Sequence, residues 1–333
     1  MKKLLILFLL FLFTLCSCKK EDKEVHSVYI DAKSYVVIDK TTNRVLEGKN
    51  INDRMLPAST TKVLTCLTVL NNFDINQYIT ITREMINIEG SRLYLNEGEV
   101  ISVLDLLYGL MLNSGNDASL ALAIGLTGNV NNFTYLMNEE CKKIGMLNST
   151  FENPNGLDGY TKNLTTTYDM SLLLSRALEN ETFRKIASTK EYKAKLPTGR
   201  TLYFNNKHRL IHTNDLVTSG KTGYTKKAGR TLLTSYKKDN FEIVICTFDC
   251  GNDWEVHNAL ANKTFNTFNQ ERIIKYVDLI NYVGLNIDKN KLLFPLEITE
   301  SKDQITSKIN LVNNVVYINY YKDNKLIGTS RVN

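Results

Sequence analysis

The stretch Pro57-Ala58-Ser59-Thr60-Thr61-Lys62 is followed by an apolar segment that continues to about Leu70. Its apolar side chains recur with helical spacing, and no glycine or proline interrupts them. The pattern predicts a helix that begins at or next to Ser59, with Ser59 and Lys62 on the same face. A hydroxyl beside a lysine of depressed pKa is suited to acyl transfer, because the amine can take the hydroxyl proton. Alone, a serine and a lysine three residues apart are weak evidence.

Two further short motifs strengthen this interpretation. Ser114-Gly115-Asn116 follows an apolar helical segment, and Lys221-Thr222-Gly223 ends a predicted strand. Ser-x-x-Lys, Ser-x-Asn and Lys-Thr-Gly, in this order, form the signature set of penicillin-binding proteins and serine β-lactamases. Taken singly, each motif also has a purely structural explanation. Asn116 could cap a helix, and Lys221-Thr222-Gly223 could be the end of a strand that runs into a turn. The combination of all three motifs is improbable by chance.

The residues around the motifs resemble the low-molecular-mass D-Ala-D-Ala carboxypeptidases of peptidase family S11. The resemblance is carried by Pro57–Lys62, Leu112–Ala118 and Lys221–Thr225, together with connecting segments such as Gly90–Leu95 and Phe151–Asp158. It covers about residues 28–275. It implies an α/β (α+β) fold of the serine β-lactamase and DD-peptidase type: an antiparallel sheet flanked by helices, an all-helical subdomain and a small β-rich C-terminal domain.

The resemblance also implies a reaction. The enzyme would remove the terminal D-Ala from peptidoglycan stem peptides through an acyl-enzyme on Ser59, and β-lactams would acylate the same serine. Lys62 would act as the base, Ser114 would relay the proton to the leaving amine, and Asn116 would hold the substrate amide. Lys221 would keep Lys62 poised electrostatically.

The third motif would bind the substrate. By the same resemblance, Thr222 would bind the terminal carboxylate, and the backbone N–H groups of Ser59 and Tyr224 would form the oxyanion hole. Gly223 would let the substrate approach the strand edge without a side chain in the way.

The chain departs from the family pattern in three places. Asn155 stands where the family commonly has a histidine, and Asn163–Thr166 replaces a stretch of the His-Tyr-Ser-Thr type. Many members carry an arginine beyond the third motif that helps to bind the carboxylate, and Asp253–Val256 contains none. The motifs therefore predict acylation of the serine directly. A preference for substrates with a free C-terminal carboxylate does not follow from them in the same way.

Two rival functions use the same motifs. A serine β-lactamase needs a positioned base for fast deacylation, and no glutamate-rich loop of the class A type is recognisable between the second and third motifs. A non-catalytic penicillin-binding sensor or wall module would acylate once, and the unbroken motif set argues against it. The chain has no Gly-x-Ser-x-Gly elbow, which argues against a Ser-His-Asp hydrolase.

The cysteines and histidines predict neither a metal nor a cofactor. The chain has no His-Glu-x-x-His motif, and Cys66, Cys141, Cys246 and Cys250 lack metal-ligand spacing with the four histidines. We expect these four cysteines to be buried free thiols. The net charge of +6 is too small to indicate nucleic-acid binding.

The N-terminus is typical of a secreted protein. Lys2-Lys3 precedes an apolar run over Leu4–Leu15, which is shorter than the roughly 20 residues of a membrane-spanning helix. Leu15-Cys16-Ser17-Cys18 resembles a lipoprotein signal, in which residues 1–17 are removed, Cys18 is acylated and residues 18–27 form a tether. The alternative is a plain cleaved signal with two incidental cysteines. The first interpretation implies anchoring at the outer face of the bacterial cytoplasmic membrane.

Hydrophobic patterns divide the rest of the chain into a catalytic domain over residues 28–275 and a small β-rich domain over residues 276–333. Strands are predicted at both ends of the first domain, and we expect one sheet to contain both sets. They lie at 34–39, 44–47, 216–222, 230–236 and 241–247. Between them, helices are predicted at 103–111, 118–126, 133–144 and 167–178. A last helix is predicted at 256–268, and strands follow at 314–321 and 325–328.

Overall fold

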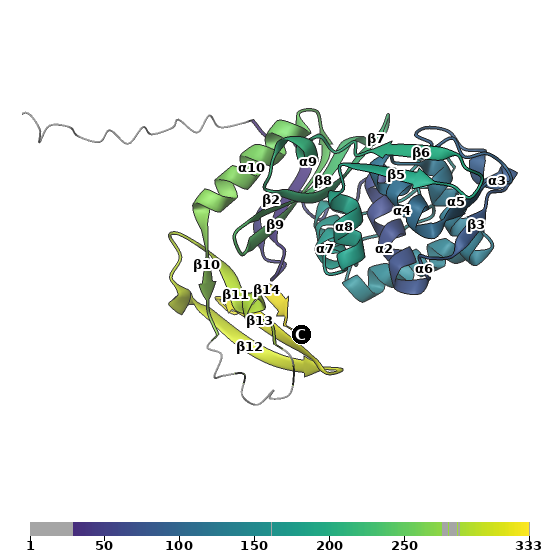
Figure 1. The fold of residues 1–333 in the computed structure, drawn as a ribbon. Coiled ribbons are helices and arrows are strands. Elements are labelled where there is room, and N and C mark those ends of the chain that lie inside the picture. Colours follow the sequence, from purple (N-terminus) through teal and green to yellow (C-terminus); the bar gives the residue numbers. More distant parts are fainter. Residues whose placement is uncertain (1–28, 161, 275–278, 280–284, 286, 333) are drawn as a thin grey trace, which may run out of the picture.

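The computed structural model describes residues 29–160, 162–274, 279, 285 and 287–332. At its centre is a five-stranded sheet in which every neighbouring pair is antiparallel (Figure 1). The strand order is β2-β1-β9-β8-β7. The strands are β1 (Ala32–Asp39), β2 (Val45–Lys49), β7 (Val217–Thr225), β8 (Gly229–Lys238) and β9 (Phe241–Cys250). The prediction that strands from both ends of residues 28–275 share one sheet is confirmed.

Both faces of this sheet are covered, which explains the nearly continuous apolar sequence of β1. Successive side chains of a strand point to opposite faces. Val36 and Ile38 pack into the core of the helical region, whereas Tyr35 and Val37 pack with α10 (Asp253–Thr267) on the other face. A strand buried on both sides needs apolar residues at consecutive positions.

The helical region is built around α2 (Lys62–Asn72). Every residue of α2 from Lys62 to Val69 is buried, and the helix packs against five other helices. Those helices are α4 (Val103–Leu112), α5 (Asn116–Thr127), α6 (Val130–Ile144), α7 (Thr167–Ala177) and α8 (Glu181–Ser188). The helices predicted between residues 103 and 178 are confirmed. The serine of the first motif therefore leads into a largely buried helix at the centre of the subdomain.

The helical region also contains elements that the sequence patterns did not predict. They are the strand pairs β3 (Tyr78–Thr80) with β4 (Val100–Ser102) and β5 (Glu191–Lys195) with β6 (Thr201–Asn205), and the short helices α3 (Arg83–Ile86) and α9 (Arg209–Thr213). In β5 only Ala194 is buried. Strands β3 and β4 have only three residues each, and β5 buries only one, which is too little for the alternating apolar pattern by which strands are recognised.

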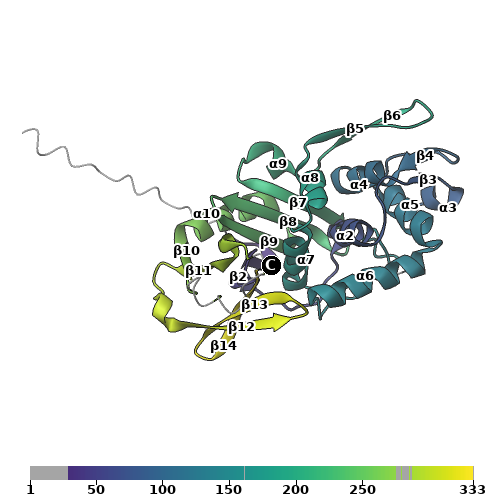
Figure 2. The same cartoon turned by 60° about the horizontal axis from the view of Figure 1, so that its bottom comes forward.

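The C-terminal region is rich in strands (Figure 2). Strand β10 (Phe268–Arg272) follows α10 directly and pairs with β11 (Leu293–Glu297). Strands β12 (Ile305–Val312), β13 (Val315–Lys322) and β14 (Lys325–Arg331) form an antiparallel meander, and the 3-10 turns η3 (Lys289–Leu292) and η4 (Lys302–Gln304) flank β11. These elements share a hydrophobic core of their own. The predicted boundary at residue 276 falls among residues outside the described ranges.

The C-terminal region is joined to the central sheet by polar contacts. Arg44 forms a salt bridge of 2.8 Å with Glu300, and the Thr329 backbone N–H donates to the Thr42 carbonyl at 2.6 Å. The predicted signal peptide and tether, including Cys18, lie outside the described residues.

Candidate active site

Ser59 lies in a 3-10 turn, η1 (Ala58–Thr61), that leads directly into α2. Ala58, immediately before it, has a φ of 48°, in the left-handed region that residues other than glycine rarely adopt. Gly156 packs closely there, because a Cβ on it would lie 1.8 Å from the Ala58 carbonyl oxygen. Such backbone strain persists only where the surrounding structure imposes it. The packing therefore holds Ser59 at the entrance of the helix.

Lys62 is completely buried and its ammonium group is surrounded by acceptors. Nζ lies 2.9 Å from Ser59 Oγ, 2.8 Å from Asn116 Oδ1 and 2.7 Å from the backbone oxygen of Asn155. A protonated lysine has three hydrogens to donate, so all three contacts are satisfied in that state.

The same contacts also suit a neutral Lys62. Burial, followed by the positive charges of Lys221 and Lys207, holds the pKa of Lys62 well below its usual range. A neutral amine has two hydrogens and one lone pair. The amide and carbonyl oxygens can only accept, whereas the Ser59 hydroxyl can also donate. The lone pair of neutral Lys62 is therefore directed at Ser59.

The second motif occupies the turn between α4 and α5. Ser114 has a φ of 60°, and Gly115 is the N-cap residue of α5, so Asn116 is the first residue of the helix rather than its cap. The Asn116 side chain is buried, accepts from Lys62 and donates through Nδ2 to the Glu89 backbone oxygen at 2.7 Å. These contacts rule out the helix-cap alternative for Asn116.

The third motif lies on β7, an edge strand of the central sheet. Lys221 is buried and donates to Ser114 Oγ at 3.1 Å and to the Thr222 backbone oxygen at 2.9 Å. Burial, together with the charge of Lys207, lowers the pKa of Lys221 to about 7. The second and third motifs are thus in direct contact.

Gly223 allows the strand and the first motif to approach each other. A Cβ at this position would lie 2.3 Å from Thr231 Oγ1 and 2.9 Å from the backbone nitrogen of Ser59. We predicted that this glycine leaves room for substrate. The structure gives another reason, which is the close approach of the Ser59 backbone to β7.

An open cleft of about 330 Å³ lies over these motifs. It is lined by Ser59, Ser91, Ser114, Lys207, Thr222, Gly223, Tyr224, Arg230, Thr231, Asp253 and Trp254. The predicted residues of all three motifs therefore meet at one cleft, with Lys62, Asn116 and Lys221 buried beside it.

Three lining residues form a cluster that the sequence patterns did not reveal. Arg230 on β8 makes a two-point ion pair with Asp253, with Nη2–Oδ1 at 2.6 Å and Nε–Oδ2 at 3.2 Å. Its guanidinium also lies over the ring of Trp254, 5.6 Å from the centroid. His208 packs edge-on against the same ring. The only signal in the sequence was an arginine close after the third motif, and its orientation was not predictable.

Lys207 and two asparagines were also missed as contributors to the site. Lys207 Nζ donates to Ser91 Oγ at 3.1 Å on the wall of the cleft, and burial lowers the pKa of Lys207. Asn155 contributes its backbone oxygen to Lys62, and Asn163 donates to Thr61 Oγ1 at 3.1 Å. Two of the departures from the family pattern therefore lie against the first motif.

The cysteines and acidic residues do not form a metal site within the described ranges. No group of three or more His, Cys, Asp or Glu side chains there is arranged to hold a metal ion. Cys66, Cys141, Cys246 and Cys250 are buried free thiols, as predicted. In the same part of the chain, no helix combines the length and apolar character needed to cross a membrane.

Comparisons with known proteins agree with this geometry. The D-alanyl-D-alanine carboxypeptidase family, peptidase family S11, matches residues 21–252. D-alanyl-D-alanine carboxypeptidase DacF of Bacillus subtilis is 30% identical over 317 residues, which are 92% of this chain and 80% of that protein. DacC of Escherichia coli is 31% identical over 71% of this chain, and the match spans 60% of the E. coli protein.

The fold comparison extends to the C-terminal region. The crystal structure of D-alanyl-D-alanine carboxypeptidase DacD from Francisella tularensis superposes with a TM-score of 0.72. The superposition covers 92% of this chain and 94% of that one at 23% identity. The predicted fold class, an antiparallel sheet flanked by helices with a β-rich C-terminal region, is confirmed. The chain belongs to the D-alanyl-D-alanine carboxypeptidase family, peptidase family S11, and is a hydrolase of the peptidase class.

Proposed function

We propose that the chain is a serine-type D-Ala-D-Ala carboxypeptidase that shortens peptidoglycan stem peptides. The observation that carries this proposal is the 2.9 Å contact of Lys62 Nζ with Ser59 Oγ. The two hydrogens of neutral Lys62 are donated to Asn116 and Asn155, so its lone pair is directed at the Ser59 hydroxyl. Lys62 takes the Ser59 proton while Oγ attacks the carbonyl carbon of the penultimate D-Ala. The backbone N–H groups of Ser59 and Tyr224 stabilise the oxyanion.

Collapse of the tetrahedral intermediate releases the terminal D-Ala. The C–N bond breaks, the leaving nitrogen takes a proton through Ser114, and the rest of the peptide stays esterified to Ser59. Lys221, 3.1 Å from Ser114 Oγ, supplies the positive charge that favours this transfer. A water molecule then hydrolyses the ester and restores the Ser59 hydroxyl.

We assign recognition of the terminal carboxylate to Thr222 together with Arg230. Both line the cleft beside Ser59. Asp253 uses Nε and Nη2 of Arg230, which leaves the Nη1 hydrogens for a second carboxylate. This arrangement supplies the arginine that the sequence lacks within Asp253–Val256. Asn116 uses one Nδ2 hydrogen for Glu89, and the other is available to hold the substrate amide.

The proposal is tested by release of D-Ala from a pentapeptide ending in D-Ala-D-Ala, with Ser59→Ala as the control. We expect release by the wild type, none by the variant, and labelling of Ser59 by a fluorescent penicillin. Persistent labelling without release would indicate a binding module. Rapid loss of the label, again without release, would indicate a β-lactamase.

We further propose that Cys18 anchors the enzyme to the outer face of the cytoplasmic membrane. This rests on the lipoprotein-like sequence around Cys18 and on a site suited to an extracytoplasmic polymer. Palmitate labelling and membrane fractionation of wild type and Cys18→Ala test it. Equal membrane recovery of both forms would contradict the anchor.

A further inference from the structure

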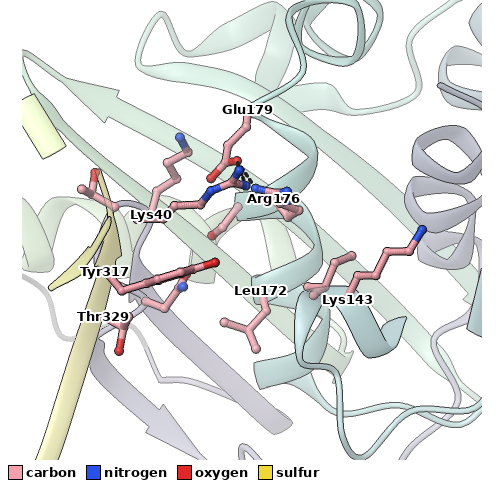
Figure 3. Close-up of a pocket in the computed structure, with 12 residues that line it drawn as sticks. Lys40, Lys143, Leu172, Arg176, Glu179, Tyr317 and Thr329 are labelled. Carbon is pink, nitrogen blue, oxygen red and sulfur yellow. Dashed lines mark hydrogen bonds and ion pairs between the residues drawn. The ribbon is translucent and has the colours of Figure 1, made fainter. Parts of the chain in front are cut away.

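A second cavity lies where the C-terminal strands meet the catalytic region, and it shares no lining residue with the cleft over the three motifs. It has a volume of about 160 Å³, which is room for a small anion or a few water molecules. Its walls come from the turn after β1, the ends of α6 and α7, and strands β13 and β14. Figure 3 shows Lys40, Arg176 and Glu179 near one another, with Tyr317 and Thr329 on the side of the C-terminal strands. We call this space the interdomain cavity.

The polar groups around the interdomain cavity lack partners to an unusual degree. Within the described residues, eight buried side-chain N or O atoms have no hydrogen-bond partner, and three of them belong to residues lining this cavity. They are Asn43 Oδ1, Ser175 Oγ and Arg331 Nε. Ser175 is only 4% exposed. Ser175 Oγ and Arg331 Nε can donate to an anion, whereas Asn43 Oδ1 can only accept. Buried polar groups are normally hydrogen-bonded, so two unpaired donors on the lining residues make this cavity a candidate anion site.

Lys40 is the second observation. Its side chain is partly buried and makes no ion pair or hydrogen bond within the described part of the chain. Desolvation lowers the pKa of Lys40, although the charges of Glu242 and Glu179 act in the opposite direction.

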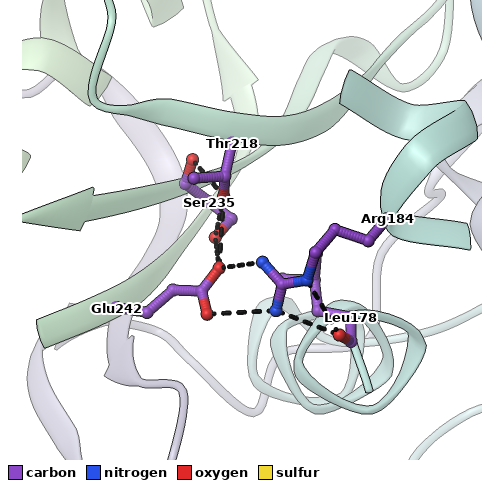
Figure 4. Close-up of polar contacts among 5 residues, drawn as sticks. All are labelled: Leu178, Arg184, Thr218, Ser235 and Glu242. Atoms are coloured by element: carbon purple, nitrogen blue, oxygen red, sulfur yellow. Dashed lines mark hydrogen bonds and ion pairs between the residues drawn. The ribbon is translucent and has the colours of Figure 1, made fainter. Parts of the chain in front are cut away.

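The two carboxylates that face Lys40 are already bound to other residues. Glu242 is held by Arg184 at 2.8 Å and by Thr218 and Ser235, as Figure 4 shows. Glu179 is bound by Arg176, and Arg331 lies 3.6 Å from the same carboxylate oxygen. Both carboxylates favour the charged form of Lys40 electrostatically, but within the described residues neither forms an ion pair or hydrogen bond with it.

The charges around the interdomain cavity favour an anion. Lys40, Arg176 and Arg331 carry three positive charges against the single negative charge of Glu179. Lys143 is also on the wall, but it pairs with Glu140 at 2.7 Å and extends away from Lys40 in Figure 3. The C-terminal ends of α6 and α7 each contribute about half a negative charge through the helix dipole. Together they reduce the net positive charge around the cavity but do not cancel it.

We propose that the interdomain cavity binds a phosphate-type oxyanion, held by Lys40, Arg331 and Ser175 with support from Arg176. Guanidinium and ammonium donors suit tetrahedral oxyanions with several acceptor oxygens. Because Arg331 belongs to β14 and Lys40 follows β1, the bound anion would join the C-terminal region to the catalytic region. This site is separate from the proposed catalytic cleft and does not depend on the reaction assigned to it.

The test is binding of inorganic phosphate to the full chain, measured by calorimetry at about 20 °C and by the thermal unfolding temperature, against chloride at equal ionic strength. We expect saturable binding to the wild type and a rise in Tm. In Lys40→Met and in Arg331→Gln, the Kd should rise at least tenfold. Lys143→Gln is the matched control, because it removes a wall lysine that already has a partner, and its Kd should stay within twofold of the wild type.

Glycerol 3-phosphate, tested in parallel, distinguishes the source of the anion. Tighter binding of the ester than of phosphate would assign the site to a phosphorylated ligand, and equal or weaker binding would assign it to free phosphate. Because calorimetry is done below the unfolding transition, a less stable Arg331→Gln protein still reports a Kd. No response beyond that to chloride, or an unchanged Kd in Lys40→Met, would overturn the proposal and leave a cavity that holds only water.

Discussion

Replacing Arg230 by glutamine tests whether the cluster on β8 recognises the substrate carboxylate. Glutamine removes the positive charge and the two-point ion pair with Asp253 but keeps a polar side chain of moderate length. A hydrogen bond to a charged group contributes about 1.5–3 kcal/mol, and each 1.4 kcal/mol is a factor of ten. The Arg230 side chain is 41% exposed, so solvent screening places the effect at the lower end. We expect kcat/KM for a D-Ala-D-Ala peptide to fall about 10- to 30-fold.

The assay compares two substrates that differ only at the C-terminus. One ends in D-Ala-D-Ala, and the other ends in D-Ala-D-alaninamide, which has no carboxylate. The wild type should prefer the acid by about the factor that Arg230→Gln loses, because only the acid contacts the guanidinium. The variant should lose most of this preference and keep only the part that Thr222 contributes. A variant that keeps the full preference for the acid, or loses activity equally on both substrates, would refute the assignment.

Stability must be separated from recognition in this experiment. The Asp253 side chain is only 3% exposed, so Arg230→Gln leaves a buried carboxylate unpaired at a cost of about 1–3 kcal/mol. The double variant Arg230→Gln/Asp253→Asn removes that carboxylate and should recover most of the lost thermal stability. It should not recover the preference for the acid substrate. Lys207→Gln, elsewhere on the wall of the cleft, should retain that preference and serves as the matched control.

Four other outcomes follow from the geometry. Lys62→Met should reduce the rate of penicillin acylation by about 10²–10⁴-fold, the usual contribution of a general base. The kcat/KM should fall above about pH 7, because Lys221 loses its charge as pH rises through its lowered pKa, and in Lys221→Arg this alkaline limb should vanish from the pH profile. Lys207→Gln should shift the acidic limb to higher pH, because removing a nearby cation raises the pKa of Lys62 and the neutral amine then forms only at higher pH. Gly223→Ala should slow acylation and lower Tm, because its Cβ would meet the Ser59 backbone. Gly251→Ala, at a glycine with no atom near its Cβ and no positive φ, should leave both unchanged.

Much of the molecule follows from local patterns in the sequence. Helix spacing located α2 and the four helices between residues 103 and 178, because a side chain buried on one helix face recurs every three to four positions. Runs of apolar residues located the strands of the central sheet. Strand β5 escaped prediction because it buries only Ala194. Strand β6 buries Leu202 and Phe204 in alternation, a pattern that is present in the sequence but spans only five residues.

The sequence by itself also determined which residues carry the proposed chemistry, since the order and spacing of the three motifs are enough to name Ser59, Lys62, Asn116 and Lys221. Only the tertiary structure decided what surrounds them. The backbone oxygen of Asn155 contacts Lys62 although the two residues are 93 positions apart in the sequence, and Arg230 pairs with Asp253, 23 positions away. A backbone oxygen has no sequence signature, and a contact between distant segments depends on how the whole chain packs. For that reason the proposed nucleophile was legible in the sequence, whereas the direction of the Lys62 lone pair and the arginine of the cleft were not.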